Sequence, residues 1–211
     1  MPTKKTNISA AVVRRLPRYY RKMLELLTTG IDHISSGELA AQMGFTASQI
    51  RQDLNHFGGF GQYGYGYNVS YLKDELAKIL GIDKTYNVII LGAGHLGSAL
   101  ANHAPTEKLT FICRALFDIN PERIGKTEGN APILDVRDLE AYLNEHPTDV
   151  AVLTIPPFEA FEIAERLATA GVPAIWNFTS ADLSVSIPDV VIENIHLSDS
   201  LMTLSYYLNH K

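Results

Sequence analysis

Three glycines and one carboxylate have the spacing of a dinucleotide site. An apolar run at residues 87–91 predicts a buried β-strand that leads directly into Gly92, Gly94 and Gly97. In a G-x-G-x-x-G turn the glycines permit a tight turn, the close approach of a pyrophosphate and close packing of the next helix. Asp118 ends the next apolar run, 21 positions after Gly97, near the spacing of about 20 at which an acid binds the ribose hydroxyls. The pattern predicts NAD or NADH, because Asp118 would repel a 2′-phosphate.

The end of a later strand completes the predicted pocket. Thr154, Ile155 and Pro156 lie by position at the carboxyl end of a strand, where dinucleotides bind in an open α/β sheet. Two plainer interpretations stay open: the glycine turn binds nothing, and the prolines at 156 and 157 only turn the chain from a strand into a helix. The predicted cofactor-binding set is Gly92, Ala93, Gly94, His95, Leu96, Gly97, Asp118, Thr154, Ile155 and Pro156.

The elements that position these residues alternate as a parallel sheet requires. After Asp118 the sequence predicts a short strand and a helix, then a strand, a helix and a last strand. Their ranges are 131–134, 136–145, 149–154, 158–170 and 174–177. We therefore expect an α/β fold with a Rossmann domain that binds NAD(H) over residues 81–195.

Charge divides the chain more clearly than its net value of −5 suggests. Residues 1–60 carry eight basic and four acidic residues, a net charge of +4, and the remainder carries −9. A basic N-terminal unit joined to an acidic unit suggests that only the first meets a polyanion. The sequence contains no membrane-length apolar run and no signal peptide, and its one cysteine cannot build a disulfide framework. We expect a cytoplasmic protein.

The basic unit is predicted to contain three short helices. The first covers residues 10–28 and ends at Gly30. The second starts with a capping box, Ser35 with Glu38, and stops at Gly44. The third is capped by Thr46. The apolar face predicted for the first helix consists of Tyr20, Met23, Leu24 and Leu27.

The third helix has the polar surface of a DNA recognition helix. Side chains of these types read base edges and bind phosphates in a major groove. The next segment, residues 57–67, alternates aromatic residues with glycine, as the hairpin of a wing does. We expect a winged helix-turn-helix domain over residues 1–80, with a small helical interaction domain as the alternative. The predicted DNA-binding residues are Ser48, Gln49, Arg51, Gln52, Asn55 and, in the wing, Tyr63.

Together these motifs resemble the Rex family of redox-sensing transcriptional repressors over nearly the whole length. The matching segments are residues 15–21, 48–54, 57–58, 64–67, 92–97, 117–121 with Gly125, and a C-terminal helix. The resemblance implies a dimer that binds operator DNA and responds to the NADH/NAD+ ratio. Family members commonly carry basic residues at the position of Gln52 and in the wing, where this chain has Gln62 and Tyr63. Fewer charges imply weaker, less salt-dependent DNA binding or a different operator.

The resemblance also implies a link between the first helix and the nucleotide pocket. The family often builds it from an arginine, a tyrosine and an aspartate. Arg21 matches the arginine, whereas His103 and His196 stand at the other two positions. One hypothesis is that their protonation biases the switch; the alternative is that they are a polar helix residue and a loop residue. Neither has the partners of a zinc site.

A C-terminal segment, residues 196–211, carries an apolar stripe of Leu197, Leu201, Leu204 and Leu208. A terminal helix must bury this stripe somewhere. In the Rex family a matching helix is exchanged between subunits, so the resemblance implies a domain-swapped homodimer. Packing of the helix on its own sheet remains the alternative.

The preferred function is a redox-sensing repressor that binds operator DNA and is released when NADH binds. The alternative is a small NAD-dependent oxidoreductase. The chain is not expected to be an enzyme, because it lacks a substrate domain and a Tyr-x-x-x-Lys pattern or a His and Asp arrangement beside the nicotinamide. Another adenine ligand, such as coenzyme A, is a third possibility.

Overall fold

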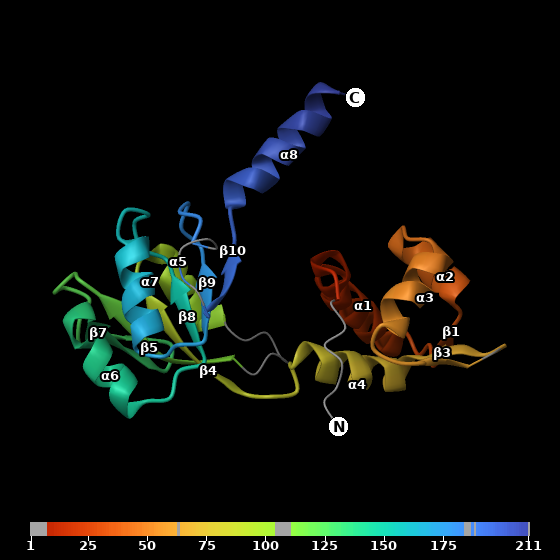
Figure 1. Cartoon of the computed structure of the whole chain (residues 1–211), viewed down its shortest axis with the longest axis horizontal. Helices are drawn as coiled ribbons and strands as arrows, with labels where there is room; N and C mark the ends of the chain where they lie inside the picture. The colour runs from red at the N-terminus through yellow and green to blue at the C-terminus, as the bar shows by residue number, and fades with distance from the viewer. Residues whose placement is uncertain (1–7, 63, 104–110, 184–186, 188, 211) are drawn as a thin grey trace. The chain divides into compact units, whose positions relative to one another are not determined.

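The computed structural model describes residues 8–62, 64–103, 111–183, 187 and 189–210. The chain divides into two compact units, and the boundary in the sequence falls between Lys84 and Thr85. Figure 1 gives the order of the elements along the chain. The predicted fold class, a winged helix-turn-helix domain followed by a Rossmann domain and a C-terminal helix, is confirmed element by element below.

In the described residues of the first unit, four helices combine with a small antiparallel sheet in the strand order β1-β3-β2. Strands β2 and β3 form the predicted wing hairpin, and β1 adds a third strand that the sequence did not predict. Helix α4 was not predicted either. The helices are α1 (Ala10–Thr28), α2 (Ser36–Met43), α3 (Ala47–Asn55) and α4 (Val69–Leu80), and the strands are β1 (His33–Ile34), β2 (Gly61–Gln62) and β3 (Gly66–Asn68).

The helix boundaries of this unit follow from side-chain caps. The capping box between Ser35 and Glu38 is complete, and Gly44 ends α2 in the left-handed conformation with φ of 69°. The hydroxyl of Thr46 accepts the Gln49 N–H over 3.1 Å at the start of α3. These short-range bonds explain why the starts of α2 and α3 could be predicted.

The buried face of α1 differs from the prediction. The structure buries Leu16, Tyr19, Met23 and Leu26, whereas Tyr20 and Leu27 are only partly buried. Spacing could not separate the two faces, because tyrosine and leucine occur in adjacent pairs on this helix. A hydrogen bond from the Tyr19 hydroxyl to a carboxylate of α3 draws Tyr19 inward, and the rest of the stripe follows.

The second unit is built on a seven-stranded sheet in the order β10-β9-β8-β4-β5-β7-β6. All neighbours pair in parallel except β6 and β7, which are antiparallel. Strands β6 and β10 were not predicted. The strands are β4 (Tyr86–Leu91), β5 (Phe111–Asp118), β6 (Thr127–Glu128), β7 (Ala131–Asp135), β8 (Val150–Leu153), β9 (Ala174–Asn177) and β10 (Val191–Asn194).

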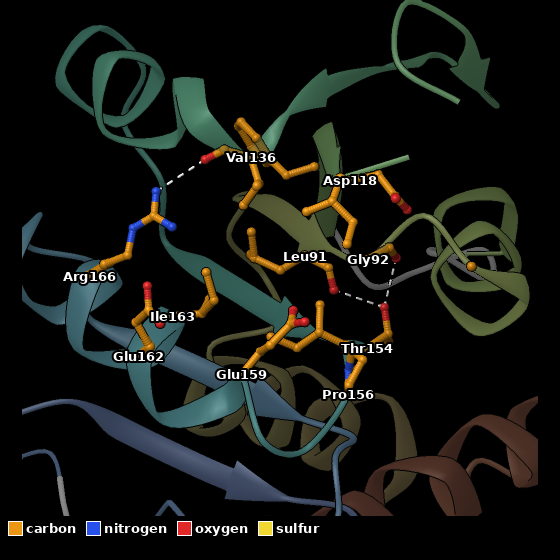
Figure 2. Close-up of a pocket in the computed structure, with 14 residues that line it drawn as sticks. Leu91, Gly92, Asp118, Val136, Thr154, Pro156, Glu159, Glu162, Ile163 and Arg166 are labelled. Carbon is orange, nitrogen blue, oxygen red and sulfur yellow. Dashed lines mark hydrogen bonds between the residues drawn. The ribbon is translucent and has the colours of Figure 1, made fainter. Parts of the chain in front are cut away.

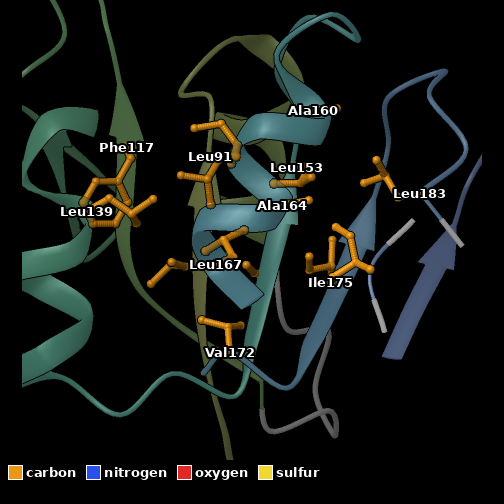
Figure 3. Close-up of a cluster of buried hydrophobic side chains, with 14 of the residues drawn as sticks. Leu91, Phe117, Leu139, Leu153, Ala160, Ala164, Leu167, Val172, Ile175 and Leu183 are labelled. Carbon is orange, nitrogen blue, oxygen red and sulfur yellow. The ribbon is translucent and has the colours of Figure 1, made fainter. Parts of the chain in front are cut away.

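Helices α5 (His95–His103), α6 (Leu139–Glu145) and α7 (Ala160–Thr169) connect these strands. The predicted helix over 136–145 is divided, because a 3-10 turn (Val136–Asp138) precedes α6. Figure 3 shows Ala164 and Leu167 of α7 packed on Leu91 and Leu153 of the sheet. The small alanine lets α7 approach the sheet closely, and this fixes the helix beside the carboxyl ends of β4 and β8.

Helix α8 (Leu197–Asn209) carries the predicted apolar stripe but buries none of it. Leu197 is 65% exposed, Leu201 68%, Leu204 55% and Leu208 62%. The alternative that α8 packs on its own sheet therefore has no support in these residues. Among helices of the described residues, none is both long and apolar enough to cross a membrane.

Candidate functional site

The glycine turn at the end of β4 requires glycine for steric reasons. Gly92 has φ of 98°, and a Cβ atom there would lie 2.6 Å from the carbonyl oxygen of Thr154. A Cβ atom on Gly97 would collide with the carbonyl oxygen of Gly92. At Gly94 a Cβ atom would meet no protein atom within 4 Å. Gly92 and Gly97 are needed for the turn itself, whereas Gly94 leaves open space for a ligand.

Asp118 is held in place by two backbone amides. Its Oδ2 accepts the Ala93 N–H over 2.7 Å, and its Oδ1 accepts the Asn120 N–H over 2.8 Å. A carboxylate has about four acceptor positions, so both oxygens can still bind the hydroxyls of a ribose. The half-buried acid is thus oriented before any ligand arrives.

Thr154 joins the end of β8 to the glycine turn. Its Oγ1 lies 3.0 Å from the Leu91 carbonyl oxygen and 2.8 Å from that of Gly92, and its hydroxyl donates to this pair. Figure 2 shows these bonds beside Pro156. The contact brings two segments that are 62 residues apart to one edge of the sheet, as expected for adjacent parallel strands.

A cavity of about 500 Å³ lies along this edge. Its size falls within the range of small-molecule and cofactor sites, about 300–1,000 Å³. Among the predicted cofactor-binding residues, Gly92, Gly94, Asp118, Thr154, Ile155 and Pro156 line it. The lining residues that were not predicted are Leu91, Phe117, Ile119, Val136, Glu159, Glu162, Ile163 and Arg166.

The other predicted residues of the turn do not line this cavity. Ala93 and Gly97 are buried behind it, and His95 and Leu96 are exposed at the start of α5. The amides at the N-terminus of a helix favour a phosphate. These four residues can therefore contribute through the backbone, and the side chains of Ala93, His95 and Leu96 do not line the cavity.

Helix α7 supplies a polar wall that the sequence did not indicate. Arg166 binds Glu140 of α6 through Nε over 2.5 Å and through Nη2 over 2.9 Å, and Nη2 also donates to the Val136 carbonyl oxygen over 3.1 Å (Figure 2). Hydrogen bonding to Arg166 lowers the pKa of Glu140 below its ordinary value. Val136 follows the end of β7 directly, so it could have been predicted from the rule that ligands bind at the carboxyl ends of parallel strands. No local pattern in the sequence shows which face of α7 borders the pocket.

A polar network braces the turn from behind. Arg123 donates to the Ala93 carbonyl oxygen, and the single hydroxyl proton of Ser98 is shared between that oxygen and a carboxylate oxygen of Glu128. Glu128 accepts from Ser98 over 2.9 Å and from the Asn102 amide over 3.1 Å, and these bonds lower the pKa of its carboxyl. The Ala93 N–H donates to Asp118, so the backbone N–H and the carbonyl group of Ala93 are both held by hydrogen bonds.

In the first unit, α3 presents its polar face to solvent. Ser48, Arg51, Gln52 and Asn55 are exposed, and Gln49 is half-buried. The Arg51 guanidinium donates to the hydroxyl of Ser36 over 2.9 Å, which holds it at the start of α2. Tyr63 lies outside the described residues. The described residues of this face are accessible, and their contact with DNA stays a prediction.

The three predicted coupling residues are less well defined. Arg21 is exposed on α1. His196 precedes α8, with Nδ1 3.7 Å from Asp199 Oδ2 and with a buried Nε2 that has no hydrogen-bond partner in the described part of the chain. His103 ends α5, and its side chain lies outside the description. Within the described residues no group of His, Cys, Asp or Glu could hold a metal ion.

Fold and site together define a class: a winged-helix unit followed by a Rossmann unit with a nucleotide-type pocket. Two family descriptions match these parts, "Putative DNA-binding protein N-terminus" over residues 7–55 and "CoA binding domain" over residues 83–181. Each of these descriptions covers only one part of the chain, so relatives that match over nearly its whole length are needed to identify the family.

The redox-sensing transcriptional repressor Rex of Caldanaerobacter subterraneus subsp. tengcongensis is 54% identical over 99% of this chain and 93% of its own length. Rex of Clostridium botulinum is 51% identical over 98% of both chains. The crystal structure of RSP in complex with β-NAD+ and operator DNA matches with a TM-score of 0.92 and 53% identity over 98% of this chain and 94% of RSP. RSP in complex with β-NADH matches with a TM-score of 0.88 at 51% identity, over 98% and 96%.

The chain belongs to the Rex family of redox-sensing transcriptional repressors. The predicted resemblance and the predicted repressor function are confirmed. Because the full-length relatives are repressors, the chain is a transcription regulator rather than an enzyme. The alternative of a small NAD-dependent oxidoreductase is therefore set aside.

Proposed function

We propose that this chain binds operator DNA through its winged-helix unit and is released when NADH occupies the cavity of its Rossmann unit. The observation that carries the proposal is the cavity that adjoins both the glycine turn and the oriented carboxylate of Asp118. RSP, with the same fold, has been captured with NAD+ and operator DNA and with NADH, which supports the assignment.

Different residues around the cavity would bind different parts of the dinucleotide. The turn from Gly92 to Gly97 and the first amides of α5 would bind the pyrophosphate. Asp118 would accept the hydroxyls of the adenosine ribose. Thr154, Ile155 and Pro156 would contact the nicotinamide half, since β8 lies on the opposite side of β4 from β5.

Helix α3 and the wing would form the DNA interface. Ser48, Gln49 and Arg51 would meet the bases, and Gln52, Asn55 and Tyr63 would add polar contacts at the groove and backbone. The net charge of +4 over residues 1–60 favours approach to the phosphates.

Redox control requires that NADH and NAD+ differ in affinity for the DNA-bound and released states. Arg21, His103 and His196 are proposed to couple the units, with protonation of the histidines as a further influence. Measuring NADH affinity from about pH 6 to 8, across the titration range of histidine, tests this part. An affinity that does not change with pH would exclude the influence of protonation.

A homodimer completes the proposal. The exposed apolar stripe of α8 would be buried against a second copy, in the manner of the exchanged helix that the family uses. A two-fold dimer would place its recognition helices on half-sites about 34 Å apart or a multiple of that. We place the dimer in the cytoplasm, where both operator DNA and free NADH are available.

The deciding experiment is selection from a library of random duplexes in parallel with NAD+ and with NADH. The proposal predicts enrichment of an inverted repeat with NAD+ and its loss with NADH. Failure to enrich any sequence in either state would contradict it. Because one matching family is described as CoA binding, competition between coenzyme A and NADH should accompany the selection; displacement of NADH by coenzyme A would assign the cavity to a different ligand.

A further inference from the structure

The inner face of the recognition helix carries a buried negative charge. Asp53 of α3 is only 3% exposed. Among the described residues, its side-chain hydrogen-bond partners come from α1, and His56 at the end of α3 adds a smaller electrostatic influence. Arg15 donates through Nε to Oδ2 over 2.6 Å and through Nη2 to Oδ1 over 2.7 Å. The Tyr19 hydroxyl donates to Oδ2 over 2.6 Å. We call this group the Asp53 network.

Near neutral pH, Asp53 and Tyr19 keep the protonation states that the hydrogen bonds of the Asp53 network require. Burial alone would raise the pKa of Asp53, but hydrogen bonds from Arg15 and Tyr19 outweigh it and the net pKa lies below its ordinary value. Burial, assisted by the bond to Asp53, raises the pKa of the Tyr19 phenol. The carboxylate therefore stays charged, and the phenol keeps the proton that it donates.

Stability alone is a poor explanation for such a network. Desolvation of the Asp53 carboxylate offsets much of its attraction to Arg15, whose side chain stays 21% exposed, and well-packed apolar residues are often as good as or better than a buried ion pair. The network contributes hydrogen bonds of defined geometry, which can fix the orientation of α3. The other inward side chains of α3, Ile50 and Leu54, make apolar contacts, which are non-directional, whereas a two-pronged arginine–carboxylate pair has one geometry.

Direction matters because α3 has two opposed faces. Ser48, Arg51, Gln52 and Asn55 point to solvent, and Asp53 lies between them in sequence but faces the core. A rotation of α3 about its axis would displace every exposed side chain relative to a bound duplex. The bonds to Arg15 and Tyr19, one helical turn apart on α1, oppose that rotation.

We propose that Arg15 and Tyr19 are positioning residues that fix the rotation of α3 through Asp53, so that operator selectivity depends on a network buried behind the reading face. This inference rests on the proposed function, because it takes α3 as the element that reads DNA. It adds a determinant of selectivity that lies outside the predicted contacts.

The test is an apolar replacement of the whole network, Arg15→Met with Tyr19→Phe and Asp53→Leu, in the full-length protein. Removing all three polar groups leaves no unpaired buried charge, and the net charge does not change. The ratio of affinities for the duplex that the wild type selects and for a scrambled duplex is measured by fluorescence anisotropy. Circular dichroism identifies a temperature at which the variant is folded.

We expect the selectivity ratio to fall about tenfold or more, a loss comparable to one mismatched base pair. Affinity for the scrambled duplex should stay within about threefold, because phosphate contacts set non-specific binding. A matched control removes the Lys78–Glu75 pair of α4, 2.7 Å apart within one helix, by Lys78→Ala with Glu75→Ala; its ratio should equal that of the wild type.

A folded triple variant with wild-type selectivity would overturn the inference. If the triple variant does not fold, Tyr19→Phe decides, because it keeps the ion pair and removes one directional bond: the ratio should fall roughly two- to fivefold, and an unchanged ratio overturns the proposal. A wild-type protein that selects no duplex would instead contradict the proposed function itself.

Discussion

The backbone amide of Ala93 donates a hydrogen bond to the carboxylate of Asp118 over 2.7 Å, across 25 positions of the chain. The glycine turn and the acid are therefore parts of one structure. The acid that would meet the ribose also holds the peptide that would meet the pyrophosphate. Changes at Asp118 should consequently affect both halves of the site.

Replacement of Asp118 should relax the choice between NADH and NADPH. In Asp118→Ser the negative charge that repels a 2′-phosphate is gone. We expect NADH affinity to fall about tenfold, a loss of about 1.4 kcal/mol, and NADPH affinity to rise. Calorimetric titration with both ligands measures the change. Asp138→Asn, at an exposed position that does not line the cavity, serves as the control. An unaltered NADH-to-NADPH ratio in Asp118→Ser would argue against the assigned role.

Two alanine substitutions should separate the structural glycine from the ligand-facing one. Gly97→Ala forces a Cβ atom against the Gly92 carbonyl oxygen, so we expect a loss of stability of about 1–3 kcal/mol together with weaker NADH binding. Gly94→Ala meets no protein atom within 4 Å and should weaken NADH binding with little change in melting temperature. Equal effects of both variants on melting temperature and on affinity would contradict this division.

Arg51 should make a measurable electrostatic contribution to DNA binding. If it contacts a phosphate, Arg51→Ala lowers the slope of log affinity against log salt by about 0.9. If it reads a base, the selected operator changes at one position of each half-site with a smaller change in slope. Arg137→Ala, which removes an exposed arginine bound to Asp135 in the other unit, should change neither quantity. The role assigned to Arg51 is wrong if Arg51→Ala leaves slope and operator as they are.

The lowered pKa of Asp53 predicts acid sensitivity in the first unit. A carboxyl whose folded-state pKa lies below its ordinary value of 3.8 stabilises the fold above that value and loses this contribution as the pH falls through the folded-state pKa. Hydrogen exchange of the α3 amides from about pH 5 down to about pH 2 should therefore show protection that is steady above the ordinary value and decreases below it, beyond the intrinsic change in exchange rate. The apolar triple variant should lack this component, and a wild-type profile in that variant would exclude Asp53 as its source.

Removal of α8 should abolish dimerisation. A chain ending at Ile195 lacks all the exposed leucines of the stripe, and we expect sedimentation to show a monomer. Operator affinity should then fall by orders of magnitude, because two half-sites are no longer bound together. Substitution of Ser205 by alanine within α8 provides a control that keeps the stripe. A truncated chain that remains dimeric would place the interface elsewhere.

The elements that could be predicted from the sequence are those specified by nearby residues. The Ser35 and Thr46 caps, the glycine ending of α2 and the glycine turn after β4 all depend on contacts within a few positions. Alternation of apolar strands and helices was enough to predict the parallel sheet. Thr154 lies beside Gly92 because β4 and β8 are adjacent parallel strands whose carboxyl ends meet at one edge of the sheet.

The remainder depended on tertiary packing. Arg15 and Asp53 are 38 positions apart, and neither position has a local pattern that pairs them. The buried face of α1 was mispredicted for the same reason, since Tyr19 turns inward to a partner on another helix. The α7 wall of the cavity depends on how closely Ala164 lets that helix approach the sheet.

Each unit has a hydrophobic core of its own, one drawn from α1 to α4 with the small sheet and the others from the large sheet and its helices. A chain organised in this way can be recombined near Lys84 without dividing a core. The unit that reads DNA and the unit that binds the dinucleotide can then change independently. Substitutions within the first 84 residues could direct the protein to other operators while the ligand to which it responds stays the same.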